Sequence, residues 1–366
     1  MPPANNAAFL FDKHQPLKLQ PSTYTPPGNN EVVIKNAAVA VNPYDWIIQE
    51  APNLVVSWVK LPFILGTDVA GEIVQVGAGV TRFEVGDRVV AHAVGLAKRA
   101  NRACEGGFQE YTVARTNMTS PIPHFMSHEA ACVMPLGLST AACGLFMKDY
   151  LALPSPTTPR TVSGKTLLVW GGSTSVGCNA IQLATAAGYD VITTASPKNH
   201  QYLKRLGAVH VFDYRSATVT QDIIFVFNKE NRIGAGAISI GAGSFKLCID
   251  IISAVQGNKF IAQASMDLPA FPKGILDFPG FMVGMVGHVV SGNVRLRLKG
   301  VSSKMINGVD LMANEVGKAV YEDFLPRALK ERRFVPAPEP EVVGHGLEHV
   351  QRAMDSNKKG FPQRNW

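Results

Sequence analysis

Residues 166–177 read TLLVWGGSTSVG, and this stretch decides the class of fold. Its first six residues form an apolar run typical of a buried strand, and residues 175–188 continue with apolar side chains at helical spacing. A strand at 190–196, a helix at 198–206 and a strand at 209–213 are expected next. This alternation of strands and helices predicts an α/β domain built on a parallel sheet.

The glycine-containing loop at 172–177 predicts a phosphate site. N–H groups at a helix start carry partial positive charge, so a pyrophosphate is expected there, and Gly177 lets the helix approach the strand. The match to G-x-G-x-x-G is incomplete, because Thr174 takes the middle position; hydroxyls at 173–175 are expected to donate to phosphate instead. A loop that binds a nucleotide triphosphate is not expected, because Cys178 and Asn179 stand where such a loop needs Lys and Ser or Thr. The alternative to a dinucleotide site is a Gly- and Ser-containing turn that binds no ligand. The predicted contacts are Gly172, Ser173, Thr174, Ser175 and Val176.

The end of the second expected strand indicates which dinucleotide binds. Residues 194–199, TASPKN, contain no Asp or Glu of the kind that accepts from the ribose hydroxyl of NAD. They offer a hydroxyl, an ammonium and an amide to a 2′-phosphate, and Tyr214 follows the third strand. A solvated lysine and a tyrosine used only in packing are the alternatives. NADP(H) is therefore the predicted cofactor, held by Ser196, Pro197, Lys198, Asn199 and Tyr214.

The chain has 366 residues, which is long enough for two domains. Residues 151–165 are rich in Pro, Ser and Thr and are typical of a connector. Before it, residues 31–41 predict a strand, and residues 66–91 alternate short Val and Ile strands with Gly turns, as in an all-β segment. The predicted domains are 1–150, completed by 315–366, and 151–314. Helices are expected at 316–332 and 346–355.

Composition excludes several other classes of protein. The net charge is +7 and the pI about 9.1, but Lys and Arg are scattered and no aromatic-and-basic module accompanies them, so no nucleic-acid partner is expected. The five cysteines are isolated, which disfavours disulfides and a zinc cluster and indicates a reducing compartment. No charged leader and no uninterrupted apolar stretch of about 20 residues is found, so a cytoplasmic location without a membrane partner is expected.

The second half of the predicted nucleotide-binding domain is irregular in sequence. Residues 248–253, CIDIIS, resemble a fourth strand, but only 254–258 separate them from the next strand at 259–264, too few for the expected helix. A Gly-rich insert, IGAGAISIGAG at 233–243, precedes them. This half is therefore either remodelled or affected by a gene-model fault. At the C-terminus, FPQRNW follows Gly360 where a returning strand is expected.

Several short motifs together resemble the medium-chain dehydrogenase/reductase superfamily over nearly the whole chain. The most specific is GTDVAGEIV at 66–74, with VG at 76–77, GDRV at 86–89 and GGFQEY at 106–111. Within this superfamily the chain is similar to zinc-independent quinone reductases and to fungal trans-acting enoyl reductases. The motifs that carry this second likeness are VNPYD at 41–45, LGLSTA at 136–141, VWGGS at 169–173 and TASPKN at 194–199.

The resemblance implies a fold and the absence of a metal. The fold is a Rossmann-type doubly wound parallel sheet together with a GroES-like β-rich catalytic domain. Thr67 and Asp68 follow Gly66, where the zinc enzymes of the superfamily have His and Glu, and no four-cysteine lobe occurs near 97–104, so no metal is expected. Dimers through edge strands are usual in the superfamily, which leaves monomer and homodimer as alternatives.

The resemblance also implies roles for individual residues. The implied cofactor contacts in the first domain are Tyr44, Asp45, Trp46 and Ile47. The implied substrate contacts are Leu138, Thr140, Ala141 and Leu145. Some enoyl reductases have lysine where this chain has Ile47, so the proton donor to the enolate is left to Tyr44, Thr140 or water. The apolar runs at 136–147 and 271–290 offer an acyl pocket or a packed core.

These observations lead to one hypothesis with two alternatives. The leading hypothesis is an NADPH-dependent reductase of activated C=C bonds, a trans-acting enoyl reductase for an acyl or polyketide thioester in secondary metabolite biosynthesis. Its partners would be a small-molecule or carrier-bound acyl substrate and a polyketide synthase. The alternatives are a quinone or enone oxidoreductase of broad range, and an NADP-binding protein with little or no turnover.

Overall fold

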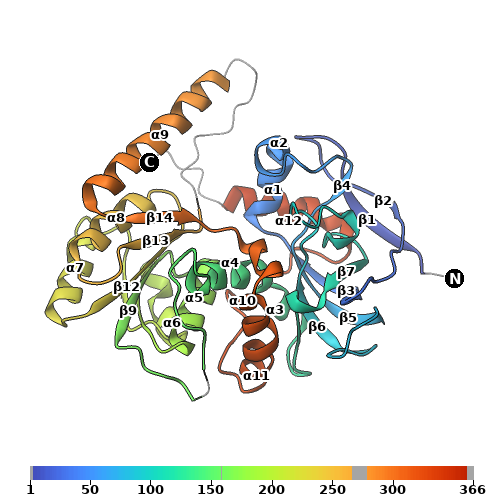
Figure 1. Cartoon of the computed structure of the whole chain (residues 1–366). Helices are drawn as coiled ribbons and strands as arrows, with labels where there is room; N and C mark the ends of the chain where they lie inside the picture. The colour runs from blue at the N-terminus through green and yellow to red at the C-terminus, as the bar shows by residue number, and fades with distance from the viewer. Residues whose placement is uncertain (1–2, 158, 266–277, 361–366) are drawn as a thin grey trace. The chain divides into compact units, whose positions relative to one another are not determined.

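The structure, a computed structural model, describes residues 3–157, 159–265 and 278–360 (Figure 1). Contacts within the chain divide it into two compact units. The first unit consists of Met1–Leu136 and Leu311–Trp366, and the second consists of Gly137–Asp310. The sequence placed these boundaries at 151 and 315. The first boundary lies earlier because helix α4 (Pro135–Phe146) packs almost entirely with the second unit.

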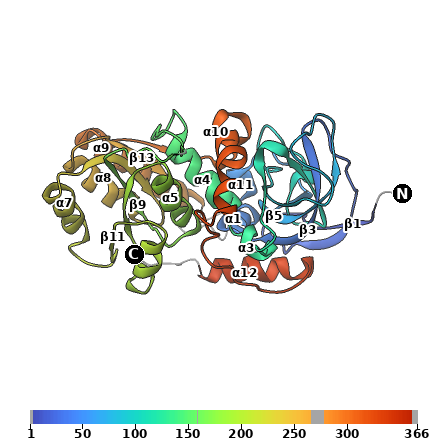
Figure 2. The same ribbon diagram turned by 90° about the horizontal axis from the view of Figure 1, so that it is seen from below.

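The second unit is built on a parallel sheet of six strands (Figure 2). The strand order is β11-β10-β9-β12-β13-β14, and all neighbouring strands are parallel, so the chain starts at β9, winds to one edge and then returns to build the other half. This is the doubly wound α/β fold that the sequence predicted. Its strands are β9 (Lys165–Trp170), β10 (Asp190–Thr194), β11 (His210–Phe212), β12 (Ile233–Ser239), β13 (Phe260–Gln263) and β14 (Ser302–Met305). Its helices, besides α4, are α5 (Ser175–Ala186), α6 (His200–Arg205), α7 (Val219–Lys229), α8 (Ser244–Ala254) and α9 (Phe278–Lys299), with short turns η3 (Pro197–Asn199) and η5 (Gly308–Ala313).

The predicted strand at 248–253 is wrong, because these residues lie in helix α8. The Gly-rich segment that was interpreted as an insert forms the fourth strand, β12. Gly236 is required in this strand, because it has φ +104° and a Cβ there would lie 2.3 Å from Leu151 Cδ2 and 2.8 Å from the Phe260 oxygen. Strand β12, helix α8 and strand β13 thus complete a regular unit, so this half is not remodelled.

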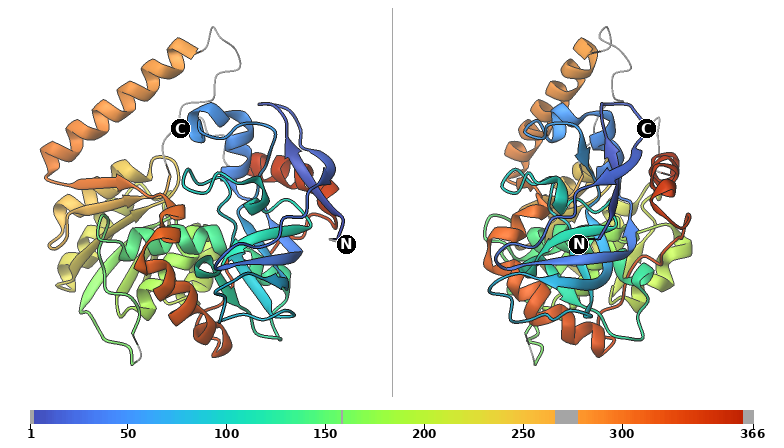
Figure 3. Two further views of the ribbon diagram at one scale, coloured as in Figure 1. Left: turned by 45° about the vertical axis from the view of Figure 1, so that its right-hand side comes forward. Right: turned by 90° about the vertical axis from the view of Figure 1, so that its right-hand side faces the viewer.

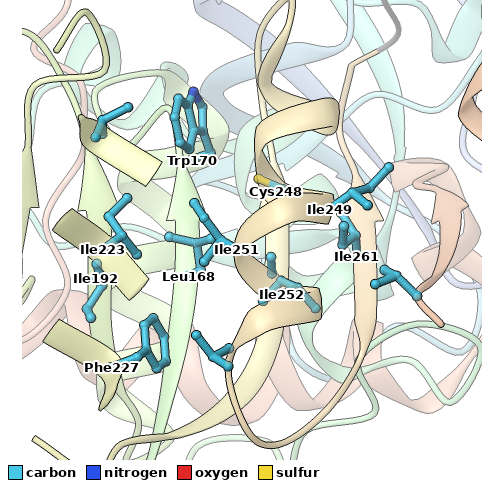
Figure 4. Packing of buried hydrophobic residues seen from close by; sticks show 14 residues of the cluster. Leu168, Trp170, Ile192, Ile223, Phe227, Cys248, Ile249, Ile251, Ile252 and Ile261 are labelled. Carbon is cyan, nitrogen blue, oxygen red and sulfur yellow. The ribbon is translucent and has the colours of Figure 1, made fainter. Parts of the chain in front are cut away.

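Helix α8 was mistaken for a strand because its buried face is broad. Cys248, Ile249, Ile251 and Ile252 are all buried and pack in one cluster with side chains from the sheet and from α7 (Figure 4). A run of Ile and Cys in which nearly every position is buried has no clear helical period, and β-branched residues favour strands when packing is ignored.

The first unit is mainly antiparallel, and Figure 3 shows its blue and cyan strands. One sheet has the order β7-β3-β5-β6-β8 and a second the order β2-β1-β4. Alternate residues such as Val32, Ile34, Val69 and Ile73 are buried in one cluster, as the short Val and Ile strands predicted. The strands are β1 (Asn5–Leu10), β2 (Lys18–Ser22), β3 (Glu31–Ala40), β4 (Phe63–Ile64), β5 (Asp68–Val76), β6 (Arg88–His92), β7 (Tyr111–Arg115) and β8 (Thr119–Pro121).

The helices of the first unit are short. The helix expected at 316–332 is interrupted by a π-helical turn, because Pro326 has no N–H for an α-helical bond and the buried Tyr321 donates its hydroxyl to the Pro135 oxygen at 3.2 Å. The C-terminal residues FPQRNW lie outside the described residues. The helices are α1 (Pro43–Glu50), α2 (Pro52–Val55), α3 (His128–Cys132), α10 (Glu315–Lys318), η6 (Ala319–Phe324), α11 (Leu325–Lys330) and α12 (Val350–Gly360), with 3₁₀ turns η1 (Ala103–Glu105), η2 (Thr116–Met118) and η7 (Leu347–His349).

One described stretch, His128–Phe146, is long and apolar enough to cross a membrane by length and composition. It covers α3 and α4, and 78% of its most apolar part is buried inside the protein. Burial of this extent is what a core helix shows, because a membrane-spanning helix would present its apolar side chains to lipid.

Candidate cofactor and substrate site

The glycine-containing loop lies between β9 and α5, beside the point where the strand order reverses from β9 to β12. Ligands of doubly wound sheets bind at this point, at the carboxyl ends of the strands. Thr174 is the N-cap of α5, since its Oγ1 accepts from the Gly177 N–H at 3.0 Å and donates to the Gly171 oxygen at 2.8 Å. Its hydroxyl is therefore used within the loop and not, as the sequence suggested, for donation to phosphate.

Two glycines of the loop stand where a Cβ would lie too close to neighbouring atoms, side-chain atoms at Gly172 and backbone atoms at Gly177. A Cβ at Gly172 would lie 2.2 Å from Thr193 Oγ1, and a Cβ at Gly177 would lie 2.3 Å from the Gly171 oxygen. The start of α5 is thereby held against the end of β9. Ser173 is half-buried next to these glycines, so its side chain and the N–H groups of the first turn fit a pyrophosphate.

The ends of β10 and β11 bring together the residues predicted to bind the 2′-phosphate. The two strands pair with Thr194 opposite Phe212, and the Ala195 N–H donates to the Phe212 oxygen at 2.9 Å. Ser196 and Tyr214 follow directly, both half-buried, and Lys198 is exposed.

Sequence reasoning missed Arg215 at this edge. Its guanidinium lies 5.7 Å from the Tyr214 ring and its Nε is 3.2 Å from Asp213 Oδ1. The Asp213 pKa is lowered by hydrogen bonds from the Arg215 backbone and side chain and by the positive charge. The signal was present, since a cation two residues after a strand end is placed like Lys198, but a single Arg at a turn is not specific.

At the opposite end of the sheet, the positive charge that a phosphate would need is already paired with carboxylates. Arg232 lies in a hollow there, with its guanidinium 2.7 Å from Asp190 Oδ2 and 2.6 Å from Glu230 Oε2. Two carboxylates already satisfy this arginine, so the loop before α5 is the better phosphate site in this unit.

In the first unit, the turn at Asn42–Tyr44 starts helix α1. The Asn42 N–H donates to Asp45 Oδ2 at 2.7 Å, which places the buried Asp45 carboxyl beneath the turn. Trp46 Nε1 donates to Asn357 Oδ1 at 3.2 Å, and helix α12 lies along α1 (Figure 2). These contacts give Asp45 and Trp46 structural roles within the unit, while their predicted contact with the cofactor stays a prediction.

Tyr44 and Ile47 are half-buried on the same helix. Burial, together with the nearby Asp45 carboxyl, raises the pKa of Tyr44 to about 12. A phenol with this pKa keeps its proton at any ordinary pH, so Tyr44 is able to donate a hydrogen bond or a proton.

The predicted substrate residues lie on α4 in the second unit. Leu138, Ala141 and Leu145 have no exposed surface and pack as core residues, whereas Thr140 is half-buried. Of the second apolar run, residues 271–277 lie outside the described residues; Phe281 is buried and Met282 is 37% exposed. Thr140 is thus the member of the predicted substrate set whose side chain is best placed for a ligand.

Gly66 is followed by two residues that form hydrogen bonds within the first unit. Within the described ranges, no three His, Cys, Asp or Glu side chains are grouped as ligands. Thr67 and Asp68 instead take part in hydrogen bonds with Asn42, at 3.2 Å to Thr67 Oγ1 and 2.9 Å to Asp68 Oδ2.

Comparison with known proteins places this architecture in a family. Residues 28–124 match the alcohol dehydrogenase GroES-like domain. The chain is 49% identical over 360 residues to "Dehydrogenase pigH" of Monascus ruber, covering 98% of this chain and 97% of the relative. It is 35% identical over 333 residues to "Trans-enoyl reductase himH" of Aspergillus japonicus, covering 90% and 86%.

A solved structure supports the same fold. Escherichia coli quinone oxidoreductase complexed with NADPH superposes with a TM-score of 0.67 at 18% identity, covering 98% of each chain. The β-rich first unit has the GroES-like fold and the second the Rossmann-type fold, as expected. With a relative nearly half identical over its whole length and both folds in place, this chain is a member of the medium-chain dehydrogenase/reductase superfamily.

Proposed function

We propose that this oxidoreductase is an NADPH-dependent enoyl reductase that acts in trans on an acyl or polyketide thioester. The observation that carries the proposal is the 35% identity, over 90% of the chain, to a protein named trans-enoyl reductase. The partner would be a polyketide synthase or another carrier of acyl chains, and the location cytoplasmic. Monomer and homodimer both remain compatible with this role.

NADPH is proposed as the cofactor from the chemistry at two strand ends. The tight loop at Gly172 and Gly177 suits a pyrophosphate, because a Cβ would collide with the Thr193 side chain at Gly172 and with the Gly171 backbone at Gly177. Lys198 and Arg215 supply positive charge after the paired ends of β10 and β11, which suits a 2′-phosphate better than the free hydroxyl of NAD.

The proposed chemistry needs a proton donor rather than a metal. When bound, reduced nicotinamide supplies the hydride that adds to the β-carbon of the enoyl thioester. The negative charge then develops on the thioester oxygen, where a neutral hydroxyl stabilises it by donating a hydrogen bond. Tyr44 and Thr140 are the proposed donors, Tyr44 because its pKa of about 12 keeps it protonated.

The test follows NADPH absorbance with purified protein and separate acceptors: enoyl thioesters of several chain lengths, a simple quinone, and a secondary alcohol with NADP. Oxidation of NADPH by thioesters alone, unaffected by a chelator, supports the proposal. Turnover of the quinone alone favours the broad-range oxidoreductase. Alcohol oxidation, with or without zinc, contradicts the mechanism, and cofactor binding without any turnover identifies a binding protein.

A further inference from the structure

Two carboxyl groups are buried around Asn42 in the first unit. Asp45 has 0% and Asp68 1% of its surface exposed. Asn42 connects them, since its backbone N–H donates to Asp45 Oδ2 at 2.7 Å and its side-chain Nδ2 donates to Asp68 Oδ2 at 2.9 Å. Ionising both of two carboxyl groups that are buried from solvent costs free energy, so the protonation states of the two groups depend on each other.

The donors around the two carboxyls are unequal. Asp68 Oδ1 also accepts from the Leu136 N–H at 2.8 Å, in the first turn of α4, where the helix dipole favours a negative charge. Asp45 Oδ1, in contrast, is buried and has no hydrogen-bond partner of good geometry within the described part of the chain, although the Gly66 backbone lies near the carboxyl. Asp68 is therefore the better place for the charge and Asp45 for a proton.

The groups that face the pair carry no positive charge near neutral pH. His92 lies opposite Asp68 in the register between β5 and β6, and burial lowers its pKa to about 3. Cys132, on α3, donates to the Asp68 backbone oxygen at 3.5 Å, and burial raises the pKa of its thiol. Tyr44, on α1, is neutral for the reason given above.

Burial raises the pKa of both carboxyls. The Asp45 value is raised to about 8, by burial and then by repulsion from Asp68, and the Asp68 value to about 7 by burial against its hydrogen bonds. Because the two groups interact, these pKa values belong to the pair. The higher pKa falls on Asp45, which has fewer hydrogen-bond donors around it than Asp68.

We propose that Asp45 and Asp68 share one proton across Asn42, with Asp45 protonated and Asp68 ionised at neutral pH, and that this pair is a positioning device. It holds the turn that carries Tyr44 and the Leu136 backbone in one arrangement. The effect on catalysis rests on the proposed enoyl reduction, whereas the shared proton does not.

The sign of the pH dependence follows from the raised pKa values. The protonated carboxyls contribute fully to the free energy of unfolding below about pH 4, the pKa of an Asp carboxyl in the unfolded chain. This contribution is lost as pH rises through about 8, the pKa of Asp45 in the folded protein. Above that pH both carboxyls are charged in a buried site, and the turn loses the arrangement that one proton maintains.

The test uses Asp45→Asn, which keeps the shape of the side chain and cannot ionise. Glu72→Gln is the matched control, because Glu72 lies on the same strand as Asp68 but is exposed. Between about pH 6 and about pH 9, the urea midpoint of the first unit should fall in wild type and in Glu72→Gln and fall much less in Asp45→Asn. Equal pH dependence in all three proteins would overturn the proposal.

A second measurement locates the proton directly. The infrared band of a protonated carboxyl should be present near neutral pH in wild type and in Glu72→Gln and disappear above about pH 8. In Asp45→Asn only Asp68 can hold a proton, so the band should disappear at a lower pH than in wild type. In Asp68→Asn, which removes the repelling charge, the band should disappear at a lower pH than in wild type. A wild-type protein without this band at about pH 6, or an unmoved midpoint in Asp68→Asn, would reject the shared proton.

The kinetic consequence is tested separately. In wild type, kcat with an enoyl thioester should be lower at about pH 9 than at about pH 7 while KM for NADPH is unchanged. In Asp45→Asn the ratio of these two kcat values should be closer to one, whatever the absolute kcat of the variant. An alkaline fall in kcat that Asp45→Asn does not relieve would overturn the positioning role. If no thioester is turned over, the proposed function fails, while infrared and unfolding still decide whether the pair shares a proton.

Discussion

Thr174 shows how one side chain replaces a glycine of the phosphate loop. It adopts an extended conformation as N-cap, and its hydroxyl both donates and accepts a hydrogen bond within the turn. An N-cap of this kind satisfies one N–H that would otherwise lack a partner and leaves the remaining first-turn donors for a ligand. Gly177, at the other end of the loop, cannot be replaced in this way, because a Cβ there would collide with backbone atoms of Gly171 and Gly172.

Gly177→Ala should weaken NADPH binding by about ten-fold or more. A Cβ there would lie 2.3 Å from the Gly171 oxygen and 2.7 Å from Gly172 Cα, so the loop has to move away from the helix start. Titration of NADPH fluorescence measures the effect. Gly287→Ala is the control, because a Cβ at that helical glycine meets nothing within 4 Å; an unchanged dissociation constant in Gly177→Ala would contradict the assignment of the loop.

Lys198→Ala and Arg215→Ala should each reduce the preference for NADPH over NADH by about ten-fold. A charge-assisted hydrogen bond to a phosphate contributes about 1.5–3 kcal/mol. NADH has no 2′-phosphate and does not form this bond, so the substitution weakens the binding of NADPH only. Dissociation constants for both dinucleotides measure the ratio. Lys204→Ala, an exposed lysine on α6, should leave the ratio unchanged. A parallel loss of affinity for both dinucleotides would place these residues elsewhere in the site.

At the scale of elements, helix α8 and strand β12 decide whether the second half of the sheet is complete. The helix buries its Ile and Cys side chains in the cluster shown in Figure 4, and the strand has glycine where neighbouring side chains and carbonyls approach its backbone. The order of strands on both sides of β9 is therefore the regular one for a doubly wound sheet, despite the unusual composition.

Ile252→Ala should destabilise the second unit by about 2–5 kcal/mol. The side chain is fully buried in the α8 cluster, so its removal loses apolar burial and leaves a cavity. Phe225→Ala, on the neighbouring helix α7, is the control because 61% of Phe225 is exposed. Urea unfolding followed by circular dichroism measures both variants, and equal midpoints would mean that α8 does not pack as described.

At the scale of the whole molecule, the two units differ in what stabilises them. The first relies on antiparallel strands with alternating buried residues, and the second on a parallel sheet with helices between successive strands. The phosphate loop and the proposed 2′-phosphate edge both belong to the second unit. Cofactor binding should therefore protect that unit first.

NADPH at about 100 times its dissociation constant should stabilise the protein by about 2.7 kcal/mol, because it binds only the folded state. Hydrogen exchange should show this protection in β9, the start of α5 and the ends of β10 and β11. NADH at the same concentration should protect less. Protection confined to the first unit would contradict the proposed position of the cofactor.

The sequence alone determined the first half of the nucleotide-binding unit and the family. Strands at β9, β10 and β11, the loop before α5 and the short Val and Ile strands of the first unit depend on local patterns, namely a buried run, a capped helix start and glycine turns. Such patterns act over a few residues, so they can be interpreted without knowing what packs against them.

Only the tertiary structure decided the identity of β12 and α8, the π-helical turn before Pro326, the use of Thr174 inside its loop, and the burial of Asp45 and Asp68 around Asn42. Apart from the Thr174 hydroxyl, whose partners Gly171 and Gly177 lie in the same loop, these features depend on partners distant in sequence. Gly236 needs Leu151 and Phe260 to explain it, and Asp68 needs Leu136. The physical reason is that close packing and the pairing of buried polar groups are properties of neighbours in space, which a local pattern does not specify.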